Sequence, residues 1–142
     1  MKKTSLLLVT LFALSVLILS ACTSGGGASA SPTGEWTLVS YGDASNLTPA
    51  LPGVETSINF NEDGTFGGSV GCNSFGSDYK VAGDQVTFGS IVSTMMFCNE
   101  ISTQESAVLA ILTDKTVSFT VNGDELTFTS ADGASVIVLA RK

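Results

Sequence analysis

The chain has 142 residues, of which 44% are hydrophobic and only 13% are charged, and it contains 15 glycines. This composition favours a single domain rich in β-structure and tight turns over a helical bundle. The formal net charge of −7 argues against nucleic-acid binding, and the absence of histidine excludes Ser-His and Cys-His catalytic pairs and removes the commonest zinc ligand.

The N-terminal segment has the pattern of a secretory leader. Lys2 and Lys3 precede an uncharged apolar run over residues 6–18, and small residues follow up to Cys22. A basic start, an apolar run and small residues before a cut site are typical of a signal peptide. A transmembrane helix is the alternative, but the run is shorter than the roughly 20 residues that span a bilayer.

The sequence Leu19-Ser20-Ala21-Cys22 resembles the lipobox of bacterial lipoproteins. The resemblance implies that residues 1–21 are a signal peptide cleaved before Cys22, which then carries a diacyl or triacyl lipid, with palmitate among its chains. Two or more acyl chains anchor a protein stably. We therefore expect a lipid-anchored protein of the cell membrane or outer membrane that faces the periplasm or the outside.

Residues 22–33 are small and polar and predict a flexible tether, so the folded domain is expected at 34–142. Loss of the leader removes Lys2 and Lys3, leaving four basic residues against all 13 acidic ones, a net charge of −9. Because like charges repel, such a domain should stand away from anionic lipid headgroups.

From residue 34 onward, short segments of alternating apolar and polar residues predict β-strands separated by tight turns. In the first segment Trp36, Leu38 and Ser40 fall on one face. The expected strands cover residues 34–41, 56–60, 65–70, 78–81, 85–88, 117–121, 126–128 and 136–139. Residues 43–53 are predicted to form a loop, and residues 89–97 an apolar, irregular segment.

One helix is predicted over residues 103–112. Ser102 is expected to be its N-cap, with Glu105 three residues later completing a capping box. Ile101, Val108 and residues 111–112 share one apolar face at helical spacing.

These elements predict an α+β domain in which about eight short antiparallel strands form a small barrel-like sheet, with the helix inserted before the last three strands. Closure of the sheet would hide its edges. The residues expected to point inward are Trp36, Leu38, Ile58, Phe60, Phe66, Phe88, Phe119, Leu126, Phe128 and Ile137.

Cys72 and Cys98 are the only cysteines of the expected domain, 26 positions apart. In an exported protein such a pair favours a disulfide. Two buried free thiols and a redox pair are the alternatives, although redox pairs usually occupy a Cys-x-x-Cys motif at a helix start.

In their order along the chain, several short motifs resemble the META domain, also called the HslJ-like domain. The residues that carry the resemblance are Gly34-x-Trp36-x-Leu38, Ile58-x-Phe60, Asp63-Gly64, Gly71-Cys72-Asn73-x-Phe75, Tyr79, Ser93-Thr94-x-Met96-x-Cys98, Glu105, Leu126-Thr127-Phe128 and Asp132-Gly133. Ser77 departs from the pattern, where a glycine is frequent. The resemblance implies a small barrel-like α+β domain, often lipid-anchored or secreted, in a family linked to heat shock, novobiocin resistance and virulence. It implies no catalytic residues.

Four groups of residues have both a structural and a chemical interpretation. Asn73 fits a turn residue in a left-handed conformation better than a pocket-lining group, and Glu105 fits a helix cap better than a catalytic acid. The run Met95-Met96-Phe97 is expected in the core, with an apolar ligand site as the alternative. Glu62 and Asp63 are expected to be solvated turn residues, since a calcium site needs more oxygen ligands.

The sequence therefore predicts a non-enzymatic, monomeric envelope protein without metal or cofactor, acting in stress or interaction with another envelope protein. The alternative is a carrier of a small hydrophobic ligand in the barrel interior, near residues 95–97. An enzyme is a remote third hypothesis, which a pocket grouping Asn73, Glu105 and Tyr79 would support.

Overall fold

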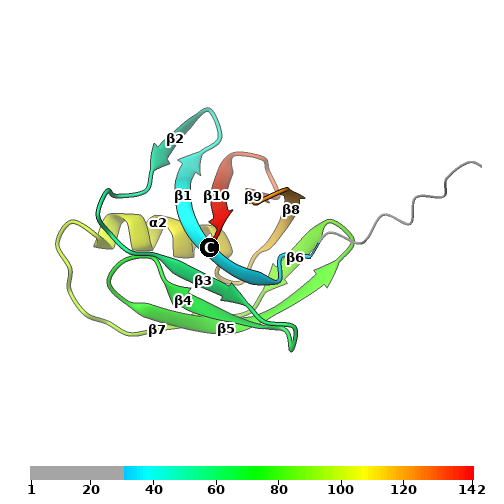
Figure 1. Ribbon diagram of the computed structural model, residues 1–142, viewed down its shortest axis with the longest axis horizontal. Coiled ribbons are helices and arrows are strands. Elements are labelled where there is room, and N and C mark those ends of the chain that lie inside the picture. Colours follow the sequence, from blue (N-terminus) through cyan, green and yellow to red (C-terminus); the bar gives the residue numbers. More distant parts are fainter. Residues whose placement is uncertain (1–30) are drawn as a thin grey trace, which may run out of the picture.

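The computed structural model describes residues 31–142, which form a closed antiparallel β-barrel with one helix (Figure 1). The lipobox, the signal peptide and most of the predicted tether lie outside the described residues. Among residues 31–142, no helix has the length and apolar character needed to cross a membrane.

The elements in chain order are β1 Gly34–Asp43, β2 Asn46–Pro49, β3 Ser57–Phe60, β4 Thr65–Ser69, β5 Ser74–Ala82, β6 Gln85–Phe88, β7 Val92–Ser93, α2 Ser102–Leu112, β8 Thr116–Asn122, β9 Glu125–Ser130 and β10 Ser135–Arg141. Eight strands follow one another around the barrel in the order β10-β9-β8-β6-β5-β4-β3-β1. The first and last of these pair along Trp36 to Asp43 and so close the sheet. The predicted barrel-like sheet of about eight strands, with the helix before the last three, is confirmed in this coarse form.

Two short strands were not predicted. β2 lies in the expected loop over residues 43–53 and pairs with the end of β1, and β7 lies in the irregular segment and pairs with β5 over two residues. Both stand beside the barrel rather than in its closed ring. Neither shows an alternation of buried residues, so periodicity could not reveal them.

The barrel interior is filled by packed side chains, and the ten large apolar residues predicted to point inward are all buried. At its centre, the ring of Phe60 lies between 5.3 and 6.2 Å from the rings of Phe66, Tyr79, Phe88 and Phe128. Such aromatic contacts stabilise a core beyond the burial of area alone.

A β-bulge in β1 changes which residues face inward. The pairing with β10 shifts between Leu38 and Ser40, and the N–H of Leu38 donates to the hydroxyl of Thr56 at 2.8 Å. Because one extra residue reverses the alternation, Tyr41 is buried where Ser40 was expected. The predicted inward orientation of Ser40 is therefore wrong.

The helix α2 covers one end of the barrel. Val108 and Leu112 join the core cluster, and the helix side chain Gln104 reaches the carbonyl of Val70 where β4 ends. The chain enters β1 at the opposite end, where Gly34 pairs with Phe60. Figure 1 shows the loop between β7 and α2 projecting from the helix side of the molecule.

Candidate functional site

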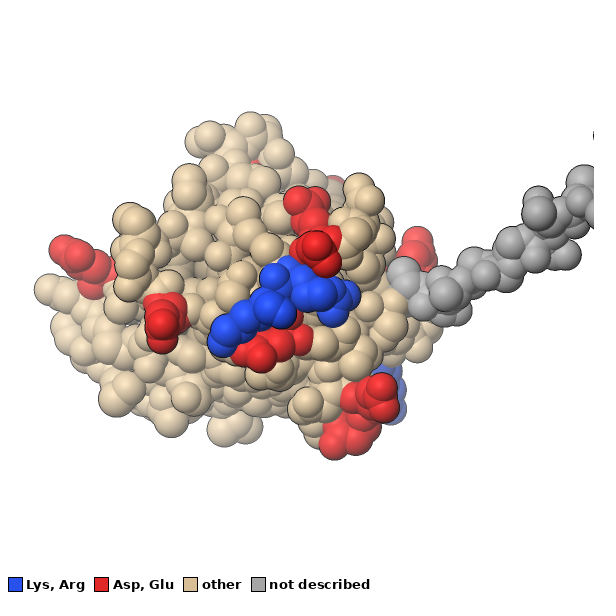
Figure 2. Space-filling view, in the orientation of Figure 1, with Lys and Arg blue, Asp and Glu red and all other residues tan. Residues whose placement is uncertain are grey.

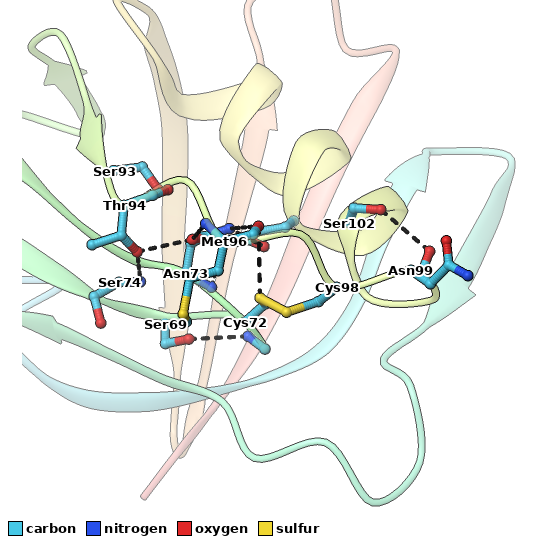
Figure 3. The surroundings of a disulfide bond; sticks show 12 residues. Ser69, Cys72, Asn73, Ser74, Ser93, Thr94, Met96, Cys98, Asn99 and Ser102 are labelled. Carbon is cyan, nitrogen blue, oxygen red and sulfur yellow. Dashed lines mark hydrogen bonds between the residues drawn. A yellow bond between two sulfur atoms is a disulfide. The ribbon is translucent and has the colours of Figure 1, made fainter.

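The segments around Cys72 and Cys98 are joined by a disulfide, with the two Cα atoms 6.2 Å apart (Figure 3). The bond links the turn that follows β4 to the loop that leads into α2. The disulfide interpretation of this cysteine pair is confirmed, and the free-thiol and redox alternatives do not describe this structure.

Asn73 fixes the same loop through its side chain. Its Oδ1 accepts hydrogen bonds from the N–H of Met96 at 2.7 Å and the hydroxyl of Thr94 at 2.9 Å, and its Nδ2 donates to the carbonyl of Met96 at 3.1 Å. Figure 3 shows Asn73 facing this loop from across the turn. The predicted left-handed turn conformation is wrong: Asn73 has no positive φ, and Gly71 takes that conformation in its place, with a φ of 146°.

Glu105 is 4% exposed and points back from α2 to Asn73. Its carboxylate accepts from the backbone N–H of Asn73 at 2.9 Å and from the side-chain Nδ2 at 3.2 Å. The predicted capping box is wrong, because the N-cap position is held by Ile101 and has no side-chain cap bond, and Ser102 donates to the carbonyl of Asn99. The carboxylate thus joins the helix to the turn instead of closing the helix end.

Gln104, which the sequence reasoning missed, is fully buried beside Glu105. Its Nε2 donates to the carbonyl of Val70 at 2.6 Å, and its Oε1 accepts from the N–H of Leu51 at 2.8 Å. Its burial could have been predicted, because Gln104 lies four residues before Val108 and eight before Leu112, on the same apolar face of the helix. A side-chain amide can be fully buried at little cost when its oxygen and its nitrogen are both hydrogen-bonded, as they are here.

Gly71 lets the turn pass close to the helix. A Cβ atom at this position would clash with the Cγ2 of Ile101 and lie 3.2 Å from Val54. With its φ of 146°, the position requires glycine for two separate reasons.

Three consecutive large apolar side chains project into solvent from this loop. Met95 is 97% exposed, Met96 61% and Phe97 84%. The expected core role of this run is wrong, because Cys98 and the hydrogen bonds to Asn73 hold the loop outside the barrel, whose interior is already filled. We call Met95, Met96 and Phe97 the apolar tip.

The remaining motif residues support the barrel rather than the tip. Phe75 packs at 5.9 Å from Phe66, and the hydroxyl of Tyr79 donates to the carbonyl of Asn61 at 2.8 Å. Asn73 and Glu105 therefore lie together, but Tyr79 does not join them. Asp63 accepts two bonds within the β3–β4 turn, which lower the pKa of its carboxyl, consistent with its expected role as a turn residue.

Two surface grooves lie away from the apolar tip. One, of about 600 Å³, runs between α2 and the β9–β10 turn, past Ala107, Ile111 and Lys115. The other, of about 490 Å³, lies beside Thr56 and Lys142. The barrel interior, where the carrier hypothesis places the ligand, is filled by packed side chains.

The charges of the domain are mostly acidic and dispersed. Figure 2 shows one strip of basic side chains between acidic ones near the centre of this face, and a smaller basic group beside acidic atoms at its lower right edge. The C-terminus carries the basic residues Arg141 and Lys142. At the C-terminus Lys142 pairs with Glu35 at 2.7 Å, and this contact lowers the pKa of the glutamate and raises that of the lysine. Exposed pairs of this kind add little stability.

Comparisons with known proteins agree with this architecture. A search of curated proteins found no match. Among solved structures, a protein from Burkholderia xenovorans is similar with a TM-score of 0.63 and 19% identity, covering 77% of this chain and 81% of its own. A DUF4847 family protein from Bacteroides vulgatus is similar with a TM-score of 0.55 and 17% identity, covering 78% and 93%. These likenesses show the fold, and the match of residues 30–142 to the META domain family shows that the chain belongs to that family.

Proposed function

We propose that this chain is a lipid-anchored, non-enzymatic module of the cell envelope that binds another envelope protein through its apolar tip. The observation that carries the proposal is the exposure of three consecutive large apolar side chains on a loop that is held in place. Single exposed apolar residues are ordinary, whereas a continuous projecting group marks an interaction site.

The loop is held in place without any contribution from the side chains of the apolar tip. The disulfide, the side chain of Asn73 and the pairing of Thr94 with Ser74 each fix a different point of it. A fixed loop loses little conformational entropy on binding, so more of the energy of burying the tip contributes to affinity. This arrangement supports docking better than a loop that must order itself first.

The partner that fits this surface is a protein with an apolar pocket bordered by basic residues. The described domain contains four basic and 13 acidic residues, so a positive border would be attracted to it. The same charge opposes insertion of the tip into an anionic bilayer. Since β1 begins at the barrel end opposite α2, a lipid on Cys22 would leave the apolar tip free to face a partner.

The alternative function is a carrier of a small hydrophobic ligand, and one observation favours it. The groove beside α2 has a volume in the range of ligand sites and a floor that includes Ala107 and Ile111. In this form the ligand would lie outside the barrel, and the apolar tip would have no part in binding it.

Photo-crosslinking in cells tests the docking proposal. The full chain would carry benzoylphenylalanine in place of Phe97, and a control chain would carry it in place of Gln85, an exposed residue at the opposite barrel end. We expect a protein adduct of one defined size from position 97 only, and its loss when Met95→Ser is added. Because Met95 is almost fully exposed, that substitution should leave the free energy of unfolding within about 0.5 kcal/mol of the original.

Identical adducts from both positions, or an adduct indifferent to Met95→Ser, would contradict docking through the tip. Phospholipid adducts alone would show that the tip contacts a bilayer and not a protein. The anchor is tested separately: Cys22→Ala should move the protein from the membrane fraction to the soluble fraction.

A further inference from the structure

The side chains of the described domain that oxidants attack most readily are concentrated at the apolar tip. The whole sequence has three methionines, and the two within residues 31–142 are Met95 and Met96. The only other sulfur atoms of the described residues are joined in the disulfide between Cys72 and Cys98.

The other oxidisable side chains are shielded. Trp36 is fully buried, Tyr41 and Tyr79 are 6% and 7% exposed, and the sequence contains no histidine. An oxidant that reaches the surface of residues 31–142 therefore meets the two exposed thioethers first.

We propose that Met95 and Met96 form an oxidation-sensitive site, at which a peroxide converts both thioethers to sulfoxides and so switches off docking of the apolar tip. In each reaction the sulfur gives an electron pair to one peroxide oxygen and the O–O bond breaks. The methionine gains one oxygen atom, and hydrogen peroxide leaves as water. The modification stands on exposure alone, and its effect on docking rests on the proposed function.

The chemistry changes the property on which docking depends. A sulfoxide is polar and accepts hydrogen bonds, whereas the thioether is apolar and flexible. A sulfoxide buried in an apolar pocket without a donor should weaken docking by about tenfold or more. Reduction by a sulfoxide reductase would restore the thioether, so the change is reversible.

The fold should not respond to the same change. The loop is held through the backbone of Met96 and through Cys98, and neither methionine side chain belongs to the core cluster. Oxidation therefore alters the apolar tip and leaves the barrel and the base of the loop as they are.

The first test is mass mapping of the full-length protein, purified in detergent after treatment with graded hydrogen peroxide. We expect one added oxygen on each of Met95 and Met96 before any other residue of the domain changes, with the thermal unfolding midpoint unmoved. Oxygen spread over Trp36 or the tyrosines at the same dose, or unmodified methionines, would overturn the site.

The second test repeats photo-crosslinking from position 97 in cells with and without peroxide. Its control is Met95→Leu with Met96→Leu, which keeps the tip apolar and cannot form sulfoxides. We expect the adduct to fall at least tenfold in the original chain and to persist in the leucine variant. If the adduct responds to peroxide equally in both chains, the switch is overturned and docking is not. If no adduct forms before treatment, docking and the switch are both overturned. The oxidation of the two methionines is then judged by the mass mapping alone.

Discussion

Replacement of Asn73 with alanine should destabilise the protein strongly, although its side chain is only partly buried. The side chain makes four hydrogen bonds: two to the backbone of Met96, one to Thr94 and one to Glu105. No water can replace all of them, because Glu105 is only 4% exposed.

The magnitude follows from the surroundings of each bond. The bond to the buried carboxylate is charge-assisted and should contribute about 2 kcal/mol, since its loss leaves Glu105 short of a donor. The three neutral bonds lie where Thr94 and Met96 meet solvent, so each should contribute about 0.5 kcal/mol. We therefore expect Asn73→Ala to lower the free energy of unfolding by about 3.5 kcal/mol, out of a total of about 5–15 kcal/mol for a domain.

Urea unfolding of the purified protein with its disulfide intact measures this change. The matched control is Ser74→Ala, because Ser74 is exposed and takes part in the loop only through its backbone. The control should stay within about 0.5 kcal/mol of the original protein. A cost below 1 kcal/mol for Asn73→Ala would refute the reasoning and show that the disulfide alone holds the loop.

Three further predictions concern the turn and the barrel. Replacing Cys72 and Cys98 together by alanine should cost about 3.5 kcal/mol in the chain-entropy account, read as a lower urea midpoint, while the same variant under reductant should show no further loss. Gly71→Ala should cost about 2–4 kcal/mol through backbone strain and overpacking, whereas Gly53→Ala, which meets nothing within 4 Å, should cost only the strain part. Hydrogen bonds from Thr65 lower the pKa of Asp63 in the folded protein, so the ionised carboxylate stabilises the fold above the ordinary aspartate pKa of about 3.9. This stabilisation is lost as the pH falls through the lower pKa of the folded state. Asp63→Asn should therefore make the free energy of unfolding less dependent on pH in the acid range.

The barrel could be predicted because its signals are local. Trp36, Ile58 and Phe128 each belong to a short alternating segment, and turns such as Asp63-Gly64 mark where the chain reverses. The bulge after Leu38 could not be predicted in this way, since the N–H of Leu38 donates to the hydroxyl of Thr56, eighteen residues away.

The sequence identified residues of the site but not how they contact one another. Asn73 and Glu105 were both recognised, but each was assigned a local role, as a turn residue and a helix cap. Their actual roles depend on contacts over 32 residues, which only the fold brings together. The exposure of Met95 escaped for the same reason, because an apolar run predicts burial unless something holds it outside.

The residues of the family motif hold this loop in place, whereas the apolar tip is exposed on it. In the motif Ser93-Thr94-x-Met96-x-Cys98, three positions hold the loop: Thr94 by its hydroxyl, Met96 by its backbone and Cys98 by its sulfur. The two positions marked x in the motif are Met95 and Phe97, whose side chains are 97% and 84% exposed. The residues that carry the family resemblance therefore build the base, Met96 through its backbone, while Met95 and Phe97 and the side chain of Met96 form the exposed apolar surface. Exchanging Met95 and Phe97 for serine should accordingly abolish docking, measured as loss of the partner that co-purifies with the full chain, while leaving the free energy of unfolding within about 0.5 kcal/mol. A large loss of stability in that variant would instead mean that the tip is part of the fold.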